Sequence, residues 1–186
     1  MGAAIVESEA MRVTRVPYAV DGWGVGELWV GDGRVVLAHE APTTAVNSNP
    51  PWGAIEPPSG TLARKPAQNG DGFVPDLVQR VHSFFAGEPV SFDDIELDLE
   101  WCTPFQRAIA DTLRAVQWGE VVSYGDLGER AGYPRAGRAA GSFCATNKFF
   151  LLLPCHRVVA TDGIGSYGSS GVAFKRRLLR LEGWAD

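Results

Sequence analysis

Residues 121–142 read Val-Val-Ser-Tyr-Gly-Asp-Leu-Gly-Glu-Arg-Ala-Gly-Tyr-Pro-Arg-Ala-Gly-Arg-Ala-Ala-Gly-Ser and predict two short helices joined by a tight turn. Ser123 and Asp126 have the spacing of a capping box, which predicts a first helix that ends near Gly132. Pro134 favours the start of a second helix. Two short helices around a turn that contains glycine are typical of a helix-turn-helix.

The second helix of this pair, residues 135–142, carries mostly Gly, Ala and Ser on its surface. Small side chains allow a helix backbone to come close to another surface. That surface is either a groove of DNA or a neighbouring helix, and both interpretations stay open at this point.

A longer helix is predicted just before this pair. Thr103 and Pro104 are typical of an N-cap followed by proline at the first helical position. The apolar residues that follow recur at a spacing of about four, as one buried stripe requires: Phe105, Ile109, Leu113 and Val116. A last helix is expected over residues 172–181, after a glycine-rich loop at 163–171 that lacks the pattern of a phosphate-binding loop.

The first half of the chain has a different texture. Residues 26–30 and 34–38 are rich in strand-forming side chains and flank Gly-Asp-Gly, which predicts a hairpin. Residues 42–75 hold seven of the 12 prolines and predict a long exposed loop. An amphipathic helix is expected over 76–85, and the alternation of apolar and acidic residues over 90–99 predicts a strand or extended edge.

These elements predict two domains. Residues 1–98 form an α/β N-terminal domain with the proline-rich loop 42–75, and residues 99–186 form a mainly helical C-terminal domain. The chain has a formal net charge of −5, but residues 1–100 carry six basic and fifteen acidic residues, against eleven and seven in 101–186. The basic second half suits a polyanion such as DNA. An arbitrary surface asymmetry explains the charges equally well.

Several classes of protein are disfavoured by composition. The apolar run at 149–154 is too short to span a bilayer, so no membrane partner is expected. The N-terminus has no basic region followed by an apolar stretch, and the chain has three cysteines, an odd number. A reduced, cytoplasmic setting is therefore expected.

The main candidates for catalytic residues lie in residues 151–159, Leu-Leu-Leu-Pro-Cys-His-Arg-Val-Val. Thiolate is the reactive form of cysteine, and basic neighbours favour it, so Cys155 is a candidate nucleophile. His156 can accept its proton directly or through water, and Glu182 can orient the imidazole. On spacing alone, a buried structural Cys–His pair is the alternative.

The segment Pro154-Cys155-His156-Arg157-Val158 resembles the active-site signature of the O6-alkylguanine-DNA alkyltransferases, also called methylated-DNA–protein-cysteine methyltransferases. The resemblance extends over about residues 97–183. Further matching segments occur in the same order and spacing: Gly119 to Tyr124, Arg138 to Gly141, Asn147, Tyr167, Lys175, Leu178-Leu179 and Glu182-Gly183.

This resemblance implies a winged-helix C-terminal domain and a DNA repair activity. The protein would flip O6-alkylguanine out of double-stranded DNA and transfer the alkyl group irreversibly to its own Cys155, in a single turnover without a cofactor. It implies a monomer in the cytoplasm or on the nucleoid. Some relatives bind zinc through N-terminal cysteines, but residues 1–100 have none, so no metal is expected.

The resemblance also implies a role for individual residues. Cys155 would be the alkyl acceptor, His156 its base through water, and Glu182 the group that holds the imidazole. Asn147 would brace the turn between the recognition helix and the active site. For the substrate, the resemblance implies that Tyr124 contacts the flipped base and that Arg138 fills the space it leaves in the duplex. The backbone of Cys155 and Val158 would hold the exocyclic amine, and the Tyr167-Gly168 loop would close over O6. Ser123 and Lys175 are also implied to contact the substrate or the DNA. Several basic residues are candidates for phosphate contact, with surface solubility as the equal alternative: Arg135, Lys148, Arg157 and 175–177.

Some positions depart from the family pattern. Lys148, Phe149 and Phe150 stand where the family commonly has prolines, which alters the expected path of this loop. Gly168 replaces a serine of some members, so only a backbone N–H is available there. Cys102 and Cys144 have no matching role and are expected to be packing residues.

Three other functions compete with alkyl transfer. A non-catalytic binder of alkyl lesions would lack the nucleophile, whereas Cys155 is present. A winged-helix regulator would need base-reading polar residues on the second helix, and these are missing. A cysteine hydrolase would turn over repeatedly and would not depend on Arg138 or on duplex DNA.

Overall fold

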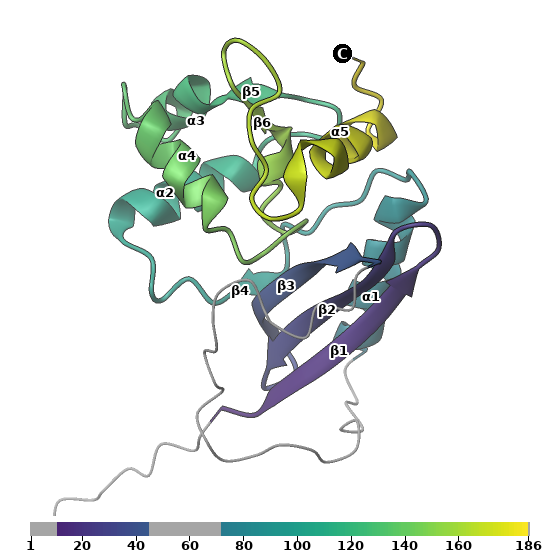
Figure 1. The fold of residues 1–186 in the computed structure, drawn as a ribbon. Coiled ribbons are helices and arrows are strands. Elements are labelled where there is room, and N and C mark those ends of the chain that lie inside the picture. The colour runs from purple at the N-terminus through teal and green to yellow at the C-terminus, as the bar shows by residue number, and fades with distance from the viewer. Residues whose placement is uncertain (1–10, 45–71, 186) are drawn as a thin grey trace, which may run out of the picture.

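The computed structural model describes residues 11–44 and 72–185. An N-terminal sheet contains β1 (Val13–Val20), β2 (Gly24–Gly31) and β3 (Val35–Thr43) in antiparallel order, and the short β4 (Glu96–Leu97) adds in parallel to β3 (Figure 1). The hairpin predicted from the sequence is confirmed as β2–β3. Its turn places Asp32 and Gly33 at positive φ, which a short aspartate or a glycine tolerates.

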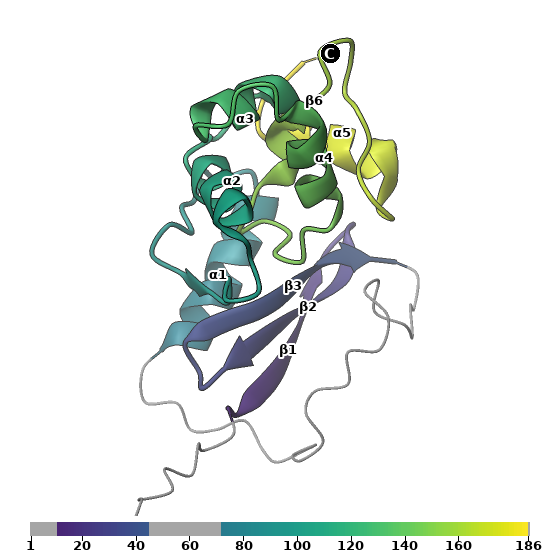
Figure 2. The same ribbon diagram turned by 90° about the vertical axis from the view of Figure 1, so that its left-hand side faces the viewer.

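Helix α1 (Phe73–Phe85) lies on one face of this sheet (Figures 1 and 2). It begins three residues earlier than expected, and its buried stripe is Leu77, Val81, Phe84 and Phe85. Of the predicted loop at 42–75, residues 45–71 lie outside the described residues, while its two ends belong to β3 and α1.

The strand expected over 90–99 is much shorter than predicted, since only β4 pairs with the sheet. The guanidinium of Arg114 donates to the carbonyls of Phe92, Asp93 and Ile95, at 2.9, 2.5 and 2.9 Å. These carbonyls converge on one cation, so this part of the segment follows a bend instead of a strand.

The C-terminal half is mainly helical. It contains α2 (Pro104–Arg114), β5 (Val122–Ser123), α3 (Tyr124–Arg130), α4 (Gly137–Ala145), the 3₁₀ turn η1 (Cys155–Arg157), β6 (Val158–Val159) parallel to β5, and α5 (Gly171–Leu181). Both predicted N-caps are confirmed: Thr103 caps α2, and Ser123 with Asp126 forms a capping box on α3.

The small residues of α4 divide between two faces of the helix. A β-carbon on Gly137 would come within 3.2 Å of the Gly125 nitrogen, and one on Gly141 would contact the Tyr124 ring at 3.6 Å. The two glycines therefore allow α4 to pack closely on α3. Arg138 and the small residues Ala139 and Ser142 are exposed instead. The helix also begins later than Pro134, because Arg135 adopts a φ of 66° that does not belong to a helix.

The two halves of the chain meet directly at β3. Its His39 forms an isolated parallel bridge with Phe149, and the His39 amide donates to the Lys148 carbonyl at 2.8 Å. A second contact joins the hairpin β1–β2 to α5, where the Arg177 guanidinium lies 3.5 Å from the centre of the Trp23 ring. Buried side chains from both halves form one continuous core, so the N-terminal sheet supports the segment that carries Cys155.

In the part of the chain that the structure describes, every helix is too short or too polar to cross a membrane.

Candidate active site

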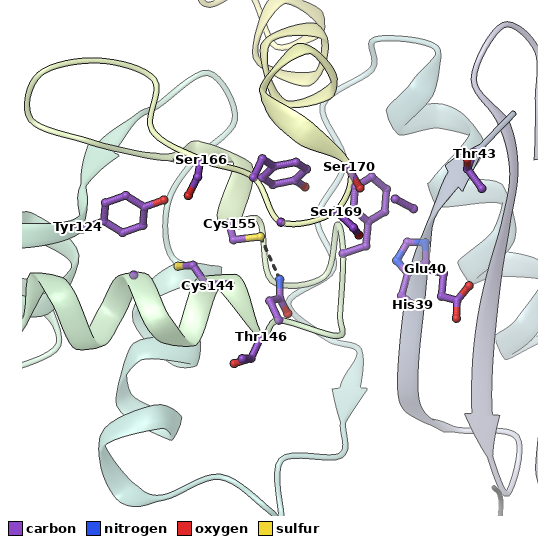
Figure 3. A pocket seen from close by; sticks show the side chains of 17 residues that line it. His39, Glu40, Thr43, Tyr124, Cys144, Thr146, Cys155, Ser166, Ser169 and Ser170 are labelled. Carbon is purple, nitrogen blue, oxygen red and sulfur yellow. Dashed lines mark hydrogen bonds between the residues drawn. The ribbon is translucent and has the colours of Figure 1, made fainter. Parts of the chain in front are cut away.

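A buried apolar segment holds Cys155 in position. Leu151, Leu152 and Leu153 are each at most 3% exposed, so this stretch is anchored in the core directly before η1. The Cys155 amide donates to the Leu153 carbonyl at 2.7 Å, which tightens the turn. The cysteine is 8% exposed and lines a pocket of about 580 Å³ (Figure 3).

Asn147 fixes the thiol from the opposite side of the turn. Its amide nitrogen donates to the Leu153 carbonyl at 2.8 Å and to the Cys155 sulfur at 3.2 Å, the dashed contact in Figure 3. Its amide oxygen accepts from the Phe149 amide at 2.9 Å. One side chain thus joins the end of α4 to the cysteine.

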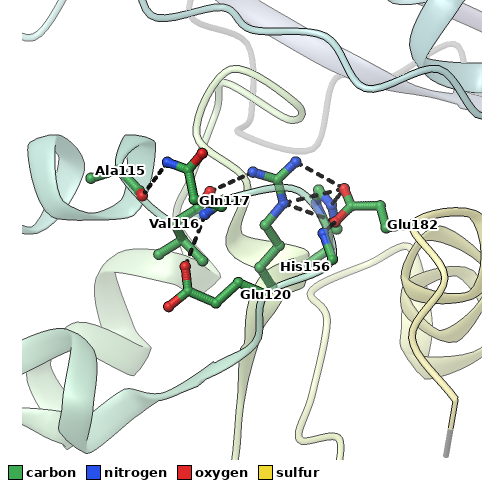
Figure 4. A network of polar contacts seen from close by, with 8 residues as sticks. Ala115, Val116, Gln117, Glu120, His156 and Glu182 are labelled. Carbon is green, nitrogen blue, oxygen red and sulfur yellow. Dashed lines mark hydrogen bonds and ion pairs between the residues drawn. The ribbon is translucent and has the colours of Figure 1, made fainter.

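His156 and Arg157, which follow the cysteine in the chain, form a buried polar network with Glu182 (Figure 4). The His156 Nε2 lies 2.8 Å from Glu182 Oε1, and the Arg157 Nε donates to Glu182 Oε2 at 2.9 Å. Arg157 also donates to the Val116 carbonyl at 2.6 Å, and the Gly119 amide donates to Glu182 Oε2 at 3.1 Å. The carboxylate therefore accepts from two side chains and one amide.

The network determines which nitrogen of His156 carries the proton. Burial favours the neutral carboxyl, but hydrogen bonds and charge from His156 and Arg157 outweigh it and lower the pKa of Glu182. An ionised Glu182 accepts, so Nε2 of His156 donates. Burial lowers the pKa of His156, which is 0% exposed, so the imidazole is neutral at pH 7. Its Nδ1 is then a bare acceptor, buried and without a partner among residues 11–44 and 72–185.

The Cys155 thiol is held near two groups that favour its ionisation. Burial raises the pKa of Cys155, while the hydrogen bond from Asn147 and the charge of Lys175 lower it and offset part of that effect. Because burial wins, the resting sulfur is a thiol and needs a base to react. Tyr167 also shares a hydrogen bond with this sulfur, and burial raises the pKa of the Tyr167 phenol well above its usual range.

Lys175 does not lie where a phosphate contact requires, which corrects one expectation from the sequence. The side chain is 0% exposed, and its ammonium donates to the carbonyls of Val158 and Ile164 at 2.5 and 2.6 Å. Burial lowers its pKa to about 8. It lies 5.9 Å from the centre of the Tyr124 ring. Lys175 therefore joins α5 to β6 and to the loop that follows β6.

Two other candidates for phosphate contact also have partners within the protein. Arg157 is buried in the network with Glu182, so its guanidinium is not available to the phosphates of DNA. Lys148 is partly buried and its ammonium lies 4.8 Å from the centre of the Trp101 ring. Arg135 is exposed beside α4.

The structure brings five of the eleven site residues expected from the sequence into the lining of one pocket: Tyr124, Asn147, Cys155, Tyr167 and Gly168. The other six lie outside this lining. His156, Glu182 and Lys175 form the buried contacts described above, Val158 is buried and its carbonyl accepts from Lys175, Ser123 caps α3 by accepting from the Asp126 amide, and Arg138 is exposed on α4.

The lining of the pocket also contains residues that were not predicted from the sequence to belong to the site. Cys144 and Ser166 lie near Cys155, and four residues of β3 line the far side: His39, Glu40, Ala41 and Thr43 (Figure 3). Cys144 was expected only to fill space. No local pattern in the sequence connects residues 39–43 with Cys155, because the contact depends on the long-range bridge between His39 and Phe149.

Comparison with known proteins places this geometry in a family. Residues 104–184 match the model of the 6-O-methylguanine DNA methyltransferase DNA-binding domain. The methylated-DNA–protein-cysteine methyltransferase of Metallosphaera sedula is 43% identical over 58% of this chain and 66% of its own length. The relative of that name in Methanosarcina acetivorans is 35% identical over 60% of this chain and 70% of its own length. The alignment to the first of these relatives thus spans just under two thirds of that protein.

Solved structures extend the likeness to nearly the whole chain. The crystal structure of Mycobacterium tuberculosis OGT in complex with DNA has a TM-score of 0.69 and 30% identity, covering 90% of this chain and 91% of that one. The R37L variant of the M. tuberculosis O6-methylguanine methyltransferase has a TM-score of 0.72 at 30% identity, over 94% and 97% of the two chains. The fold therefore agrees with an α/β N-terminal part and a helical C-terminal part. From the motif, the site geometry and these relatives together, the chain belongs to the methylated-DNA–protein-cysteine methyltransferase family.

Proposed function

We propose that this protein repairs DNA by transferring the alkyl group of O6-alkylguanine to the sulfur of Cys155. The sulfur attacks the alkyl carbon, the S–C bond forms, and the bond between that carbon and O6 breaks. The thiol proton passes through a water molecule to His156 Nδ1, and guanine leaves with the electron pair and takes up a proton from the Tyr124 phenol. The thioether product is stable, so each molecule reacts once.

One observation carries this proposal. The Cys155 thiol opens on a pocket of about 580 Å³, while the neutral His156 beside it in the sequence keeps a bare acceptor nitrogen and is held by Glu182. A buried acceptor without a protein partner is uncommon and is typical of a group that meets water or substrate. Asn147 and Lys175 favour the thiolate that forms in the reaction.

We further propose that duplex DNA binds on the exposed face of α4. Helices α3 and α4 would form the helix-turn-helix of a winged-helix domain that begins near residue 99, with residues 1–98 as the N-terminal domain. The similar M. tuberculosis protein was crystallised in complex with DNA, which supports DNA as the partner. The small exposed residues Ala139 and Ser142 suit a narrow groove, and Arg138 would fill the space left by the extruded base.

The remaining residues have roles around the flipped base. Tyr124, half-buried at the pocket wall, would contact the base, and its phenol, whose pKa is raised mainly by burial, can donate a proton or hydrogen bond to it. The Tyr167-Gly168 backbone would close over O6. The Val158 carbonyl already accepts from Lys175, but a carbonyl has two lone pairs and can also accept from the exocyclic amine of guanine.

Mass spectrometry of the intact protein tests this function. After incubation with a duplex that contains O6-methylguanine, we expect a gain of one methyl group, localised to the Cys155 peptide and absent in Cys155→Ala. Cys102→Ala is the matched control because Cys102 lies outside the pocket lining, and it should still gain the methyl group. Repeated turnover would indicate a hydrolase, binding without transfer would indicate a lesion binder, and either result would contradict the proposal. Gel filtration at micromolar concentration is expected to give a monomer.

A further inference from the structure

The pocket has a volume of about 580 Å³ and must hold a flipped base together with its O6 substituent. It extends from Tyr124 and Cys155 to β3 of the N-terminal sheet (Figure 3). A base placed against Tyr124 leaves the end beside β3 free.

A buried histidine with an unused nitrogen lies at that end. His39 is 1% exposed, and its Nδ1 has no hydrogen-bond partner within the described ranges 11–44 and 72–185. Figure 3 shows the imidazole on β3, across the pocket from Cys155. This nitrogen plays no part in the alkyl transfer proposed above.

The hydrogen bonds around Tyr18 determine the proton position on His39. The Tyr18 hydroxyl has a single proton, and it donates that proton to the Glu40 carbonyl at 2.9 Å. The same hydroxyl lies 2.8 Å from His39 Nε2, so at this contact the hydroxyl accepts and Nε2 carries a hydrogen. Burial lowers the pKa of His39 to about 3, which keeps the ring neutral. Nδ1 is therefore a hydrogen-bond acceptor that has no donor among residues 11–44 and 72–185.

The residues around His39 indicate which kind of ligand could bind at this end of the pocket. The Phe150 ring packs edge-on against the imidazole, with 5.2 Å between the ring centres, and supplies an apolar wall. The other residues at this end include Ala41 on β3 and the hydroxyl-bearing Ser169 and Ser170 in the loop before α5. An apolar chain with a hydroxyl group at its far end would match this wall and its acceptor.

We propose that the β3 end of the pocket is a subsite for extended O6 substituents, and that His39 Nδ1 accepts a hydrogen bond from a hydroxyl on the substituent. The preferred substrates would then be O6-hydroxyalkylguanines with a chain of several carbons. The subsite rests on the proposed alkyl transfer, because the substituent must reach it from a carbon held at Cys155. Residues of both halves of the chain would jointly select the lesion.

Single-turnover transfer rates from three duplexes test this subsite. The duplexes carry O6-methylguanine, O6-pentylguanine or O6-(4-hydroxybutyl)guanine, and the last two have substituents of equal length that differ in the terminal hydroxyl. The native protein should favour hydroxybutyl over pentyl by about three- to tenfold, the usual net effect of one hydrogen bond. His39→Phe should reduce this preference to less than twofold. His82→Phe, the same change at an exposed histidine of α1, should retain it.

A second variant keeps the test decisive if His39→Phe does not fold. Ala41→Phe places a ring at the β3 end of the pocket, and should lower the ratio of pentyl to methyl transfer by at least tenfold. Equal rates for pentyl and hydroxybutyl in the native protein, or an unchanged preference in a folded His39→Phe, would overturn the subsite while leaving methyl transfer intact. An unchanged ratio in Ala41→Phe would overturn it as well. Failure of the native protein to accept even the methyl group would instead overturn the proposed function, and the subsite with it.

Discussion

Replacement of Glu182 by Gln is expected to destabilise the protein by about 3–5 kcal/mol at pH 7, because it leaves a buried cation without its anion. In the native protein the carboxylate accepts from His156, Arg157 and Gly119 over distances of 2.8 to 3.1 Å at its four closest contacts. Arg157 is only 8% exposed, so water cannot replace the lost charge. The amide of Gln also turns an N–H toward donors that previously met an oxygen.

Glu120→Gln is the matched control for this change. Glu120 and Arg130 form a shorter ion pair, at 2.7 Å, but their side chains are 32% and 49% exposed. Exposed ion pairs contribute about 0–1 kcal/mol, since water already solvates both charges. A large effect at Glu182 together with a small effect at Glu120 would show that burial, and not distance, decides the contribution.

The effect of Glu182→Gln should depend on pH with a definite sign. The folded-state pKa of Glu182 lies below its unfolded value of about 4.3, so the carboxylate stabilises the fold above that pH. This contribution falls as the pH drops through the folded-state pKa, where the native carboxyl becomes protonated. The difference between native and variant protein should therefore be largest near neutral pH and shrink in acid.

Urea unfolding monitored by tryptophan fluorescence measures the difference in the free energy of unfolding directly. Thermal unfolding provides a second measurement. For a chain of this size 1 kcal/mol corresponds to about 2–4 °C in the thermal midpoint, so Glu182→Gln should lower that midpoint by about 6–20 °C. A loss below 1 kcal/mol at pH 7, or a difference that grows toward pH 3, would show that the buried carboxylate does not stabilise the fold in this way.

Three further predictions follow from the same geometry. Arg138→Ala should slow transfer from duplex DNA more than reaction with free O6-benzylguanine, because only the duplex requires extrusion of a base; equal losses measured in the two rate assays would contradict that role. Lys175→Met should lower the unfolding free energy by about 2–5 kcal/mol, since two carbonyls lose their buried donor, and should move the pH profile of alkyl transfer to higher pH because a charge that lowers the pKa of Cys155 is removed. Asn147→Ala should cost about 2–4 kcal/mol in urea unfolding through the loss of bonds to Leu153 and Phe149; thiol titration should also give a higher pKa for Cys155, and an unchanged pKa would argue against the Asn147–sulfur contact.

Local sequence patterns predicted most of the secondary structure and indicated Cys155 as the candidate nucleophile. The capping boxes at Thr103 and Ser123 predicted helix starts that the structure confirms, because capping depends on residues only three apart. The Cys155-His156 pair and the family signature around it predicted the chemistry proposed above, because both can be recognised from adjacent residues. The strand predicted over 90–99 failed because Arg114, far along the chain, bends that segment.

The construction of the site around the cysteine depends on contacts between segments that lie far apart in the chain. Lys175 looked like a surface cation in a basic run, yet folding buries it against carbonyls of β6 and the loop after it. The contribution of β3 depends on pairing between His39 and Phe149, residues more than a hundred positions apart. Spacing along a chain reports contacts within a helix or a turn, whereas burial and long-range pairing arise only when separate elements share one core.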